Sequence, residues 1–362
     1  MRTIIIWGAS RIGRGLVANI FDRADYRIVF VDSNPKLVAE LNAQGRYLIV
    51  QAKPEGIIEK LMENRFVALH TSQAEQLRSL FQEDGLLLDI AVHASVLNNV
   101  ADNLAPLIAC RAGKPMDIMM NVNIERPDAF MCQLLHQRGI DTDSIGFTCV
   151  FAMCIAPQPP EWVQKKDPLA VWNNGQIEMA ISKRHLKCPP PQVPFLRLAE
   201  DIEREETRKL YTLNMAHALL CYEGLPLGLT SPQEAADVLF SELSAALDEA
   251  SVGLTRRFHF IEKEMYEWNQ RVISFIMNPN LVDELRRLGV DSRRKLAPGD
   301  RLAGPAQLCL NAGINPIHIF RAMLAAADFE NDDPGTRAVM AYRSIHSPEQ
   351  TVEHFSGLKP GA

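Results

Sequence analysis

The chain has 362 residues, of which 47% are hydrophobic and 23% are charged, and its formal net charge is -6. This length allows two domains, and the composition is that of a globular protein rather than a disordered or fibrous one. The acidic charge argues against nucleic-acid and anionic-membrane partners, and no apolar run approaches the ~20 residues that would span a bilayer.

The first 150 residues alternate short apolar runs with longer helical patterns. The runs that predict buried strands are Ile4–Trp7, Arg27–Val31, Leu86–Val92 and Asp117–Met120. The segments that predict helices between them are 12–24, 35–43, 72–83, 96–112 and 126–138. This alternation predicts an α/β fold with a Rossmann-like, doubly wound parallel sheet.

Residues 169–182 predict a β-hairpin around an Asn-Asn-Gly turn at 173–175. Prolines at 189–191 and at 194 then interrupt the pattern. We therefore expect a dinucleotide-binding domain with a hairpin extension over 1–190 and an all-helical substrate domain over 191–362. The helices predicted in the second domain are 195–223, 232–250, 255–277, 280–288, 305–312, 316–327 and 348–355.

A glycine-rich turn joins the first predicted strand to the first helix. A dinucleotide fingerprint, G-x-G-x-x-G, lets the pyrophosphate approach the backbone at the N-terminus of a helix, and here Ser10 replaces the middle glycine. Asp32 ends the second strand, where a carboxylate would accept hydrogen bonds from the adenosine ribose and repel a 2′-phosphate. We predict that NAD, rather than NADP, is the cofactor; the alternative is a tight turn that binds nothing. The predicted cofactor-binding residues are Gly8, Ser10, Arg11, Ile12, Gly13 and Asp32.

Four polar residues recur on one side of a helix predicted in the second domain. At 100° per residue, Glu206, Lys209, Asn214 and His217 fall within an arc of about 140°. Burying these groups together is costly unless they serve one another or a ligand. The alternative is a solvated helix with a Glu–Lys pair and a structural histidine.

The motif Lys209-x4-Asn214-x2-His217 resembles the active-site pattern of the polyol-specific long-chain dehydrogenases. The resemblance covers nearly the whole chain and includes three further segments, 8–15, 120–124 and 294–302. It implies a metal-independent hydride transfer between a polyol and the nicotinamide cofactor.

The resemblance also implies a role for each of five residues. Lys209 would be the general base that removes the alcohol proton. Asn214 and Asn123 would donate hydrogen bonds to the developing alkoxide. His217 would position the substrate oxygen, and Glu206 would carry the proton toward solvent. From the sequence alone, Asn123 could equally be a cap at the end of a strand.

The chain departs from the pattern of this family at several positions. Besides Ser10, these are Arg11, His93 after the fourth predicted strand, and the pair Met153-Cys154. These departures motivate one alternative from another class, a nucleotide-binding sensor that keeps the fold without turnover. A hydroxyacid dehydrogenase with helices following a Rossmann domain is a weaker analogy at the level of the fold.

Six basic residues crowd into 286–301 of this acidic protein, namely Arg286, Arg287, Arg293, Arg294, Lys295 and Arg301. The resemblance implies that Arg294, Lys295 and Arg301 bind the phosphate of a sugar or polyol phosphate, such as mannitol 1-phosphate and fructose 6-phosphate. The alternative is a solvated cluster paired with neighbouring acids. An unphosphorylated polyol dehydrogenase or a hexuronate reductase would need a different cleft.

The remaining features concern location and partners. The seven cysteines form no CxxC pair, so we expect reduced thiols in a cytoplasmic protein with no metal site. The N-terminus shows no signal-peptide pattern. We expect a small-molecule substrate, no nucleic-acid or membrane partner, and a monomer or weak homo-oligomer.

Overall fold

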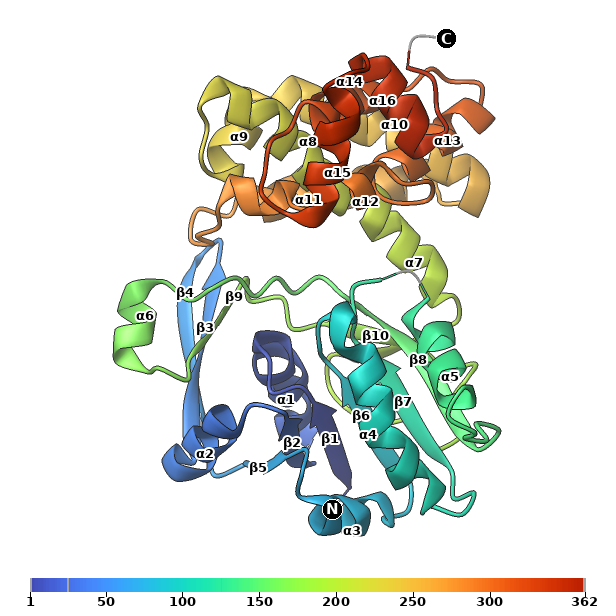
Figure 1. Ribbon diagram of the computed structural model, residues 1–362. Helices are drawn as coiled ribbons and strands as arrows, with labels where there is room; N and C mark the ends of the chain where they lie inside the picture. The colour runs from blue at the N-terminus through green and yellow to red at the C-terminus, as the bar shows by residue number, and fades with distance from the viewer. Residues whose placement is uncertain (1, 25, 125, 361–362) are drawn as a thin grey trace. The chain divides into compact units, whose positions relative to one another are not determined.

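The chain folds into two compact units, Met1–Glu203 and Arg204–Ala362 (Figure 1). The computed structural model describes residues 2–24, 26–124 and 126–360. The predicted boundary after residue 190 precedes a strand, β11, that pairs with the sheet of the first unit. Residues 191–203 therefore belong to the first unit by contact.

The first unit is built on an eight-stranded sheet in the order β11-β10-β8-β7-β6-β1-β2-β5. Its strands are β1 (Thr3–Trp7), β2 (Arg27–Asp32), β5 (Phe66–His70), β6 (Leu86–Ile90), β7 (Met116–Met120), β8 (Ile145–Ala152), β10 (Met179–Ser182) and β11 (Leu196–Ala199). All neighbouring strands are parallel except β8 and β10. The chain runs outward from β1 in both directions, so the predicted doubly wound sheet is confirmed and its switch point lies between β1 and β6.

The side chains of the central strands alternate between two hydrophobic cores. Ile4 and Ile6 of β1 pack on the face that carries residues 16–21, whereas Ile5 and Trp7 pack on the face covered by α4 and α5. A parallel strand with helices on both faces must be apolar throughout, which explains the unbroken apolar runs. The helical segments of this unit are a π-helical segment Gly13–Val17, α1 (Ala18–Phe21), 3-10 turns Asp22–Ala24 and Ala94–Val96, α2 (Pro35–Gln44), α3 (Ala74–Phe81), α4 (Leu97–Ala109), α5 (Pro127–His136) and α6 (Glu161–Lys166).

A separate three-stranded sheet, β4-β3-β9, contains β3 (Arg46–Lys53), β4 (Gly56–Glu63) and β9 (Val171–Asn173). The predicted hairpin over 169–182 is wrong, because β9 pairs with β3 while β10 pairs with β8. The asparagines of the expected turn hold other parts of the chain instead. Asn173 donates to the carbonyl of Gly15 at 3.2 Å, and Asn174 donates to the carbonyl of Met153 at 3.0 Å.

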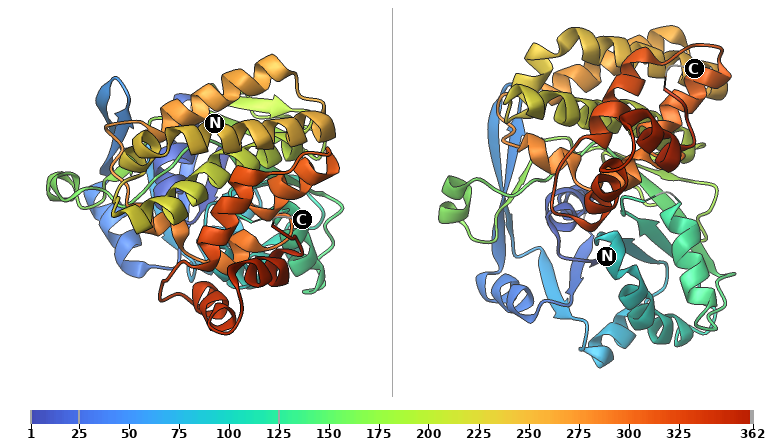
Figure 2. Two further views of the ribbon diagram at one scale, coloured as in Figure 1. Left: turned by 90° about the horizontal axis from the view of Figure 1, so that it is seen from above. Right: turned by 45° about the horizontal axis from the view of Figure 1, so that its top comes forward.

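The second unit is helical, as predicted, and Figure 2 shows its helices in yellow-green to red from two further directions. They are α7 (Ile202–Lys209), a π-helical segment Leu210–Asn214, α8 (Met215–Gly224), α9 (Pro232–Val238), α10 (Phe240–Phe258), α11 (Glu262–Ile276), α12 (Ser292–Leu296), α13 (Ala303–Asn311), α14 (Ile317–Ala327), α15 (Pro334–Arg343) and α16 (Pro348–Ser356), with 3-10 turns Leu225–Leu227 and Leu285–Gly289. Most of α8 is buried, and it packs against α9, α10 and α14.

Four of the helices predicted in the second domain differ from the structure. The predicted helix 232–250 is divided at Leu239 into α9 and α10. The predicted helix 195–223 begins in strand β11, and 255–277 breaks where His259 has φ 58°. Of 280–288, only a 3-10 turn at Leu285–Gly289 is helical. Within the described ranges, every helix is too short or too polar to cross a membrane.

Candidate active site

The glycine-rich turn after β1 has a backbone that only glycine tolerates at two positions. Gly8 has φ +101°, and a Cβ there would lie 2.5 Å from the carbonyl oxygen of Ala91. A Cβ on Gly13 would lie 2.4 Å from the carbonyl oxygen of Gly8. Contacts this short are excluded sterically, so both glycines are required for β1, the following helix and the loop after β6 to approach one another.

Ser10 occupies the middle position of the turn. Its Oγ accepts a hydrogen bond from the backbone N–H of Gly13 at 3.1 Å. The hydroxyl therefore satisfies one of the N–H groups that a helix start offers to anions, and its own hydrogen can be donated onward. Arg11 and Ile12 follow on the partly exposed side of the turn, and Arg11 donates to Oε1 of Gln158 at 3.3 Å.

Arg14 supports this turn from beneath, and the sequence analysis did not single it out. Its Nε donates to the carbonyl of Ala9 at 2.9 Å, and its Nη1 donates to the carbonyl of Leu169. The hydroxyl of Tyr47 donates to the carbonyl of Arg14 at 2.9 Å. Burial lowers the pKa of Arg14, and the neighbouring Tyr47 and two acids oppose this effect. The position of Arg14 directly after Gly13 does not indicate from sequence that its guanidinium is buried.

Asp32 couples the end of β2 to the glycine-rich turn. Its Oδ2 accepts from the N–H of Ala9 at 2.8 Å, and its Oδ1 accepts from the N–H of Asn34 at 2.9 Å. Asn34 in turn caps α2. The carboxylate stays partly exposed with acceptor sites left over, so it can also bind ribose hydroxyls. The glycines that keep the turn open and this acid together fit a dinucleotide.

The loops after β6 and β7 carry three further polar side chains. His93 is exposed, and its Nδ1 accepts from the N–H of Ser95 at 3.3 Å and contacts its hydroxyl at 2.8 Å. Asn123 is exposed in a bend just beyond β7. Asn121 lies between that bend and the strand, and its Nδ2 is buried without an acceptor among the described residues. The carboxyl ends of parallel strands are where open α/β sheets bind ligands.

The predicted catalytic residues of the second unit surround a π-helical segment. Lys209 ends α7, Leu210–Asn214 form the segment, and His217 lies in the first turn of α8. A π-helical turn closes i→i+5 hydrogen bonds, so the side chains are not spaced at the 100° per residue assumed from the sequence. Glu206, Lys209, Asn214 and His217 are all partly buried.

Packing on both sides holds this segment in place. The ring of Tyr211 lies against Gly304 of α13, where a Cβ would come within 2.3 Å of its Cζ, and its hydroxyl donates to the carbonyl of Gly299 at 3.1 Å. On the other side, the indole of Trp268 donates to Oγ1 of Thr212 at 2.8 Å. That hydroxyl donates to the carbonyl of Arg208 at 2.6 Å, which the π-helical turn leaves available.

His217 lies among charged side chains of the second unit. Burial lowers the pKa of His217 to about 4, with Asp283 opposing and the positive charges of Arg287, Arg301 and Lys209 acting in the same direction as burial. The imidazole is therefore neutral at physiological pH and can both donate and accept a hydrogen bond. Lys209, His217 and Arg301 thus lie close enough to interact electrostatically.

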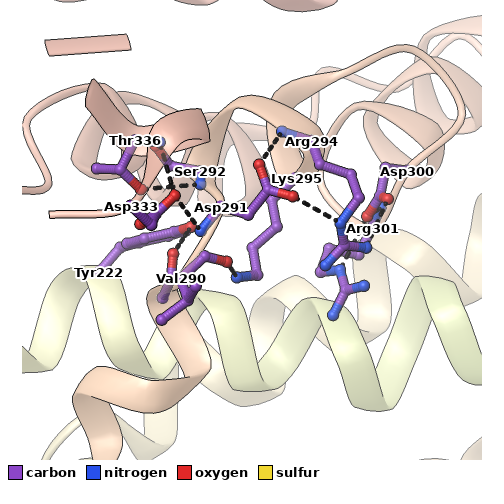
Figure 3. A network of polar contacts seen from close by, with 11 residues as sticks. Tyr222, Val290, Asp291, Ser292, Arg294, Lys295, Asp300, Arg301, Asp333 and Thr336 are labelled. Atoms are coloured by element: carbon purple, nitrogen blue, oxygen red, sulfur yellow. Dashed lines mark hydrogen bonds and ion pairs between the residues drawn. The ribbon is translucent and has the colours of Figure 1, made fainter. Parts of the chain in front are cut away.

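Three arginines of the basic cluster of 286–301 form ion pairs with acids, and Figure 3 shows those of Arg294 and Arg301. Arg294 bridges Asp291 and Asp300, both at 3.2 Å, and Arg301 binds Asp300 at 2.8 Å. Outside the figure, Arg287 pairs with a carboxylate of the preceding loop. Arg301 keeps one donor: its Nη2 is buried and finds no acceptor within the part of the chain that the structure describes.

Lys295 is turned inward rather than toward solvent. It is 3% exposed, and its Nζ donates to the carbonyl of Val290 (Figure 3). Burial, together with the neighbouring charges of Arg301 and Arg294, lowers its pKa to about 7. Of the three predicted phosphate ligands, Arg301 has the geometry that best leaves a donor for a ligand.

Outside this region, Glu223, Glu242, His318 and Arg321 form a second polar group. His318 binds Glu242 at 2.7 Å, and Arg321 binds the same carboxylate at 2.5 Å. Burial raises the pKa of Glu223 to about 7.

Among the described residues, no group of three or more His, Cys, Asp or Glu side chains could hold a metal ion.

Comparison with known proteins finds similarity to sugar-alcohol dehydrogenases. Residues 201–345 match the family model of the mannitol dehydrogenase C-terminal domain. The chain is 28% identical to mannitol-1-phosphate 5-dehydrogenase of Halalkalibacterium halodurans, covering 98% of this chain and 96% of that protein. It is 27% identical to the enzyme of the same name from Thermoanaerobacter pseudethanolicus, covering 99% and 94%.

Two solved structures share the fold. The mannitol 2-dehydrogenase of Pseudomonas fluorescens, solved with NAD and D-mannitol, aligns with TM-score 0.78 and 12% identity over 98% of this chain and 86% of that chain. A D-sorbitol dehydrogenase in substrate-free form aligns with TM-score 0.76 and 15% identity over 90% and 79%.

Proposed function

Because the chain belongs to the mannitol dehydrogenase family of polyol-specific long-chain dehydrogenases, we propose that it is an NAD-dependent polyol-phosphate dehydrogenase. The proposed reaction interconverts mannitol 1-phosphate and fructose 6-phosphate, or a close analogue. Its main support is the grouping of Lys209, a neutral His217 and Arg301 around the π-helical segment. This grouping brings a predicted base, a hydrogen-bonding partner and a cation within the range of electrostatic interaction.

In the proposed mechanism, bound NAD supplies the acceptor for the hydride of the carbinol carbon. Lys209 removes the proton of the alcohol as that hydride leaves, and it returns the proton in the reverse reaction. His217 holds the substrate oxygen through its neutral ring. Asn214 and Asn123 donate hydrogen bonds where negative charge develops on that oxygen, and Glu206 passes the proton toward solvent.

The substrate phosphate would be bound mainly by Arg301. Its Nη2 has no described acceptor, while Asp300 holds the other side of its guanidinium in a fixed orientation. Arg294 and Lys295 would contribute positive charge from behind it. Asp32 favours NAD because its carboxylate would repel the 2′-phosphate of NADP.

A second candidate function is oxidation of an unphosphorylated polyol. It is favoured by the pairing of Arg294 with two aspartates and by the inward orientation of Lys295. Both observations reduce the number of donors that remain for a phosphate.

The test is NADH consumption at neutral pH with fructose 6-phosphate, fructose, fructuronate and tagaturonate, with NADPH as the paired control. Turnover with the phosphate alone supports the proposed substrate, and Arg301→Gln should then raise its KM at least tenfold. Activity with only unphosphorylated or carboxylate sugars would retain the mechanism and reject the phosphate site. Absence of turnover despite demonstrated NADH binding would favour the nucleotide-binding sensor.

A further inference from the structure

Asn121 is a polar side chain at the carboxyl end of β7 that the fold does not use. Its backbone N–H continues the ladder by donating to the carbonyl of Ile90 at 3.0 Å. Its side-chain Nδ2 is buried, and neither polar atom of the amide is bonded to any residue that the structure describes. A buried amide N–H without an acceptor lowers the stability of the folded protein by about 1–3 kcal/mol, so this side chain does not contribute to the stability of the fold.

The side chain points to the face of the sheet that carries the glycine-rich turn. Met119 belongs to the core on that face, whereas Met120 and Val122 belong to the core on the other face. Asn121 therefore shares the face of Met119. Continuing the register of Ile90 with Met120 places it beside Ala91. The carbonyl of Ala91 is the atom that a Cβ on Gly8 would meet at 2.5 Å.

This position corresponds to one end of an extended dinucleotide. In the order β7-β6-β1-β2, Asp32 ends β2 and the glycine-rich turn follows β1. A dinucleotide with its adenosine ribose at Asp32 and its pyrophosphate at the turn has its remaining half over the ends of β6 and β7. That half carries the nicotinamide, and Asn121 lies on its path.

We propose that Asn121 is a cofactor-binding residue whose side-chain amide pairs with the carboxamide of the nicotinamide ring. The inference rests on the proposed function, because it takes NAD as the cofactor. A primary amide has a donor and an acceptor on one plane, and a carboxamide presents the complementary pair. Two hydrogen bonds would satisfy the buried Nδ2 and fix the rotation of the ring. A phosphate group of the cofactor would be a poorer partner, because its oxygens accept hydrogen bonds and would leave the side-chain oxygen of Asn121 without a donor.

The experiment compares the Kd values of three ligands for the full-length protein: NADH, ADP-ribose, and the reduced 3-acetylpyridine analogue of NADH. ADP-ribose lacks the nicotinamide, and the acetylpyridine analogue lacks only the NH2 of the carboxamide. The variants are Asn121→Leu, Asn121→Ala and the control Asn103→Leu. Asn103 lies in α4 of the same unit, where its amide donates to the carbonyl of Asn99 at 2.6 Å.

We expect Asn121→Leu to weaken NADH binding about tenfold and to change ADP-ribose binding less than twofold. The wild type should prefer NADH to the acetylpyridine analogue, and the variant should lose that preference. Its melting temperature should not fall, because an unpaired buried amide is removed. Asn121→Ala provides the same comparison should the leucine variant fail to fold. Asn103→Leu should leave all three Kd values unchanged.

Several results would overturn the inference. Unchanged NADH binding in both Asn121 variants would remove Asn121 from the site. Equal weakening of all three ligands would indicate a structural role or a contact with the ADP-ribose portion that the ligands share, and either would exclude pairing with the carboxamide. If NADH and its analogue were weakened equally, with ADP-ribose unchanged and the wild-type preference retained, Asn121 would contact the ring without recognising the NH2 of its carboxamide. A wild type that binds neither NADH nor ADP-ribose would overturn the proposed function as well, whereas the other outcomes concern Asn121 only.

Discussion

Two segments carry most of the predicted cofactor-binding and catalytic residues, and they are built in opposite ways. The first is the glycine-rich turn with the π-helical residues after it, 8–17 in the first unit, and the second is the helix around the π-helical Leu210–Asn214, residues 206–217 in the second unit. At the first, two glycines keep side chains away so that the backbone can approach a ligand. At the second, the predicted roles belong to side chains, and a glycine on another helix makes room for the ring of Tyr211. The first segment should therefore be damaged by adding atoms, and the second by removing functional groups or by filling the space around them.

The largest expected effect comes from removing a functional group of the second segment. Lys209→Ala should lower kcat by about 10²–10⁴-fold, as loss of a general base does, with the Kd of NADH nearly unchanged. Steady-state rates and NADH titration measure the two quantities. Lys263→Ala on α11 is the matched control, since that side chain is 83% exposed. Wild-type turnover of a verified substrate by the Lys209 variant would show that another group is the base.

Adding one atom to the first segment should have the next largest effect. Gly8→Ala combines φ +101° with a Cβ at 2.5 Å from the carbonyl of Ala91, so we expect a loss of about 2–4 kcal/mol in unfolding free energy and loss of NADH binding. Gly85→Ala is the control, because Gly85 has φ +61° with open space around it and should cost only about 1–2 kcal/mol. Denaturant unfolding and NADH titration distinguish them. Equal losses for the two variants would contradict a role for the close approach at Gly8.

Filling the space beside the second segment tests its support. Gly304→Ala places a methyl group 2.3 Å from Cζ of Tyr211, so we expect about 1–3 kcal/mol of destabilisation and about tenfold lower kcat with NADH binding retained. Adding Tyr211→Leu to this variant should recover part of the stability, because the clash disappears. Strictly additive losses in the double variant would show that the two residues do not act through their contact.

A smaller effect, of the opposite sign, is expected from Asp89 in β6. This carboxyl is buried without a described partner, and burial raises its pKa well above the usual value. In the unfolded chain it ionises above about pH 4, whereas the folded protein retains the proton up to its raised pKa, so Asp89 lowers stability as the pH rises above 4 and has no such cost below pH 4. Asp89→Asn should raise the unfolding free energy by about 1–2 kcal/mol at pH 7 and by less at pH 4, measured by denaturant unfolding. An equal change at both pH values would contradict the titration argument.

The smallest expected effect concerns the pH profile. Because the pKa of His217 is lowered to about 4, the imidazole stays neutral from pH 5 to 9 and should contribute no limb to the rate profile there. His217→Gln should raise KM and leave the shape of the profile unchanged over this range. A limb that disappears in the variant would show that His217 titrates during turnover.

Much of the fold could be predicted because its signals are local. The apolar runs of β1 and β6, the latter interrupted only by Asp89, indicate strands covered on both faces, and the glycine-rich turn with Asp32 indicates a dinucleotide-binding arrangement. The strands β3, β4, β5, β8 and β11 were not predicted. The pairings of β5 with β2 and of β3 with β9 depend on partners far along the chain, whereas β3 and β4 form a local hairpin that the sequence analysis did not identify. The expected hairpin failed for a related reason: its asparagines bind backbone groups of Gly15 and Met153, which the sequence does not bring near.

The candidate site divides in the same way. The sequence by itself determined the order of strand, turn and acid and the polar spacing around Lys209, since these depend on neighbours in the chain. Only the tertiary structure decided that Leu210–Asn214 form a π-helical segment, that Arg294 is paired with aspartates, and that the amide of Asn121 is left unpaired. Hydrogen bonding and burial depend on which distant groups the fold brings together, so residue type and spacing do not specify them.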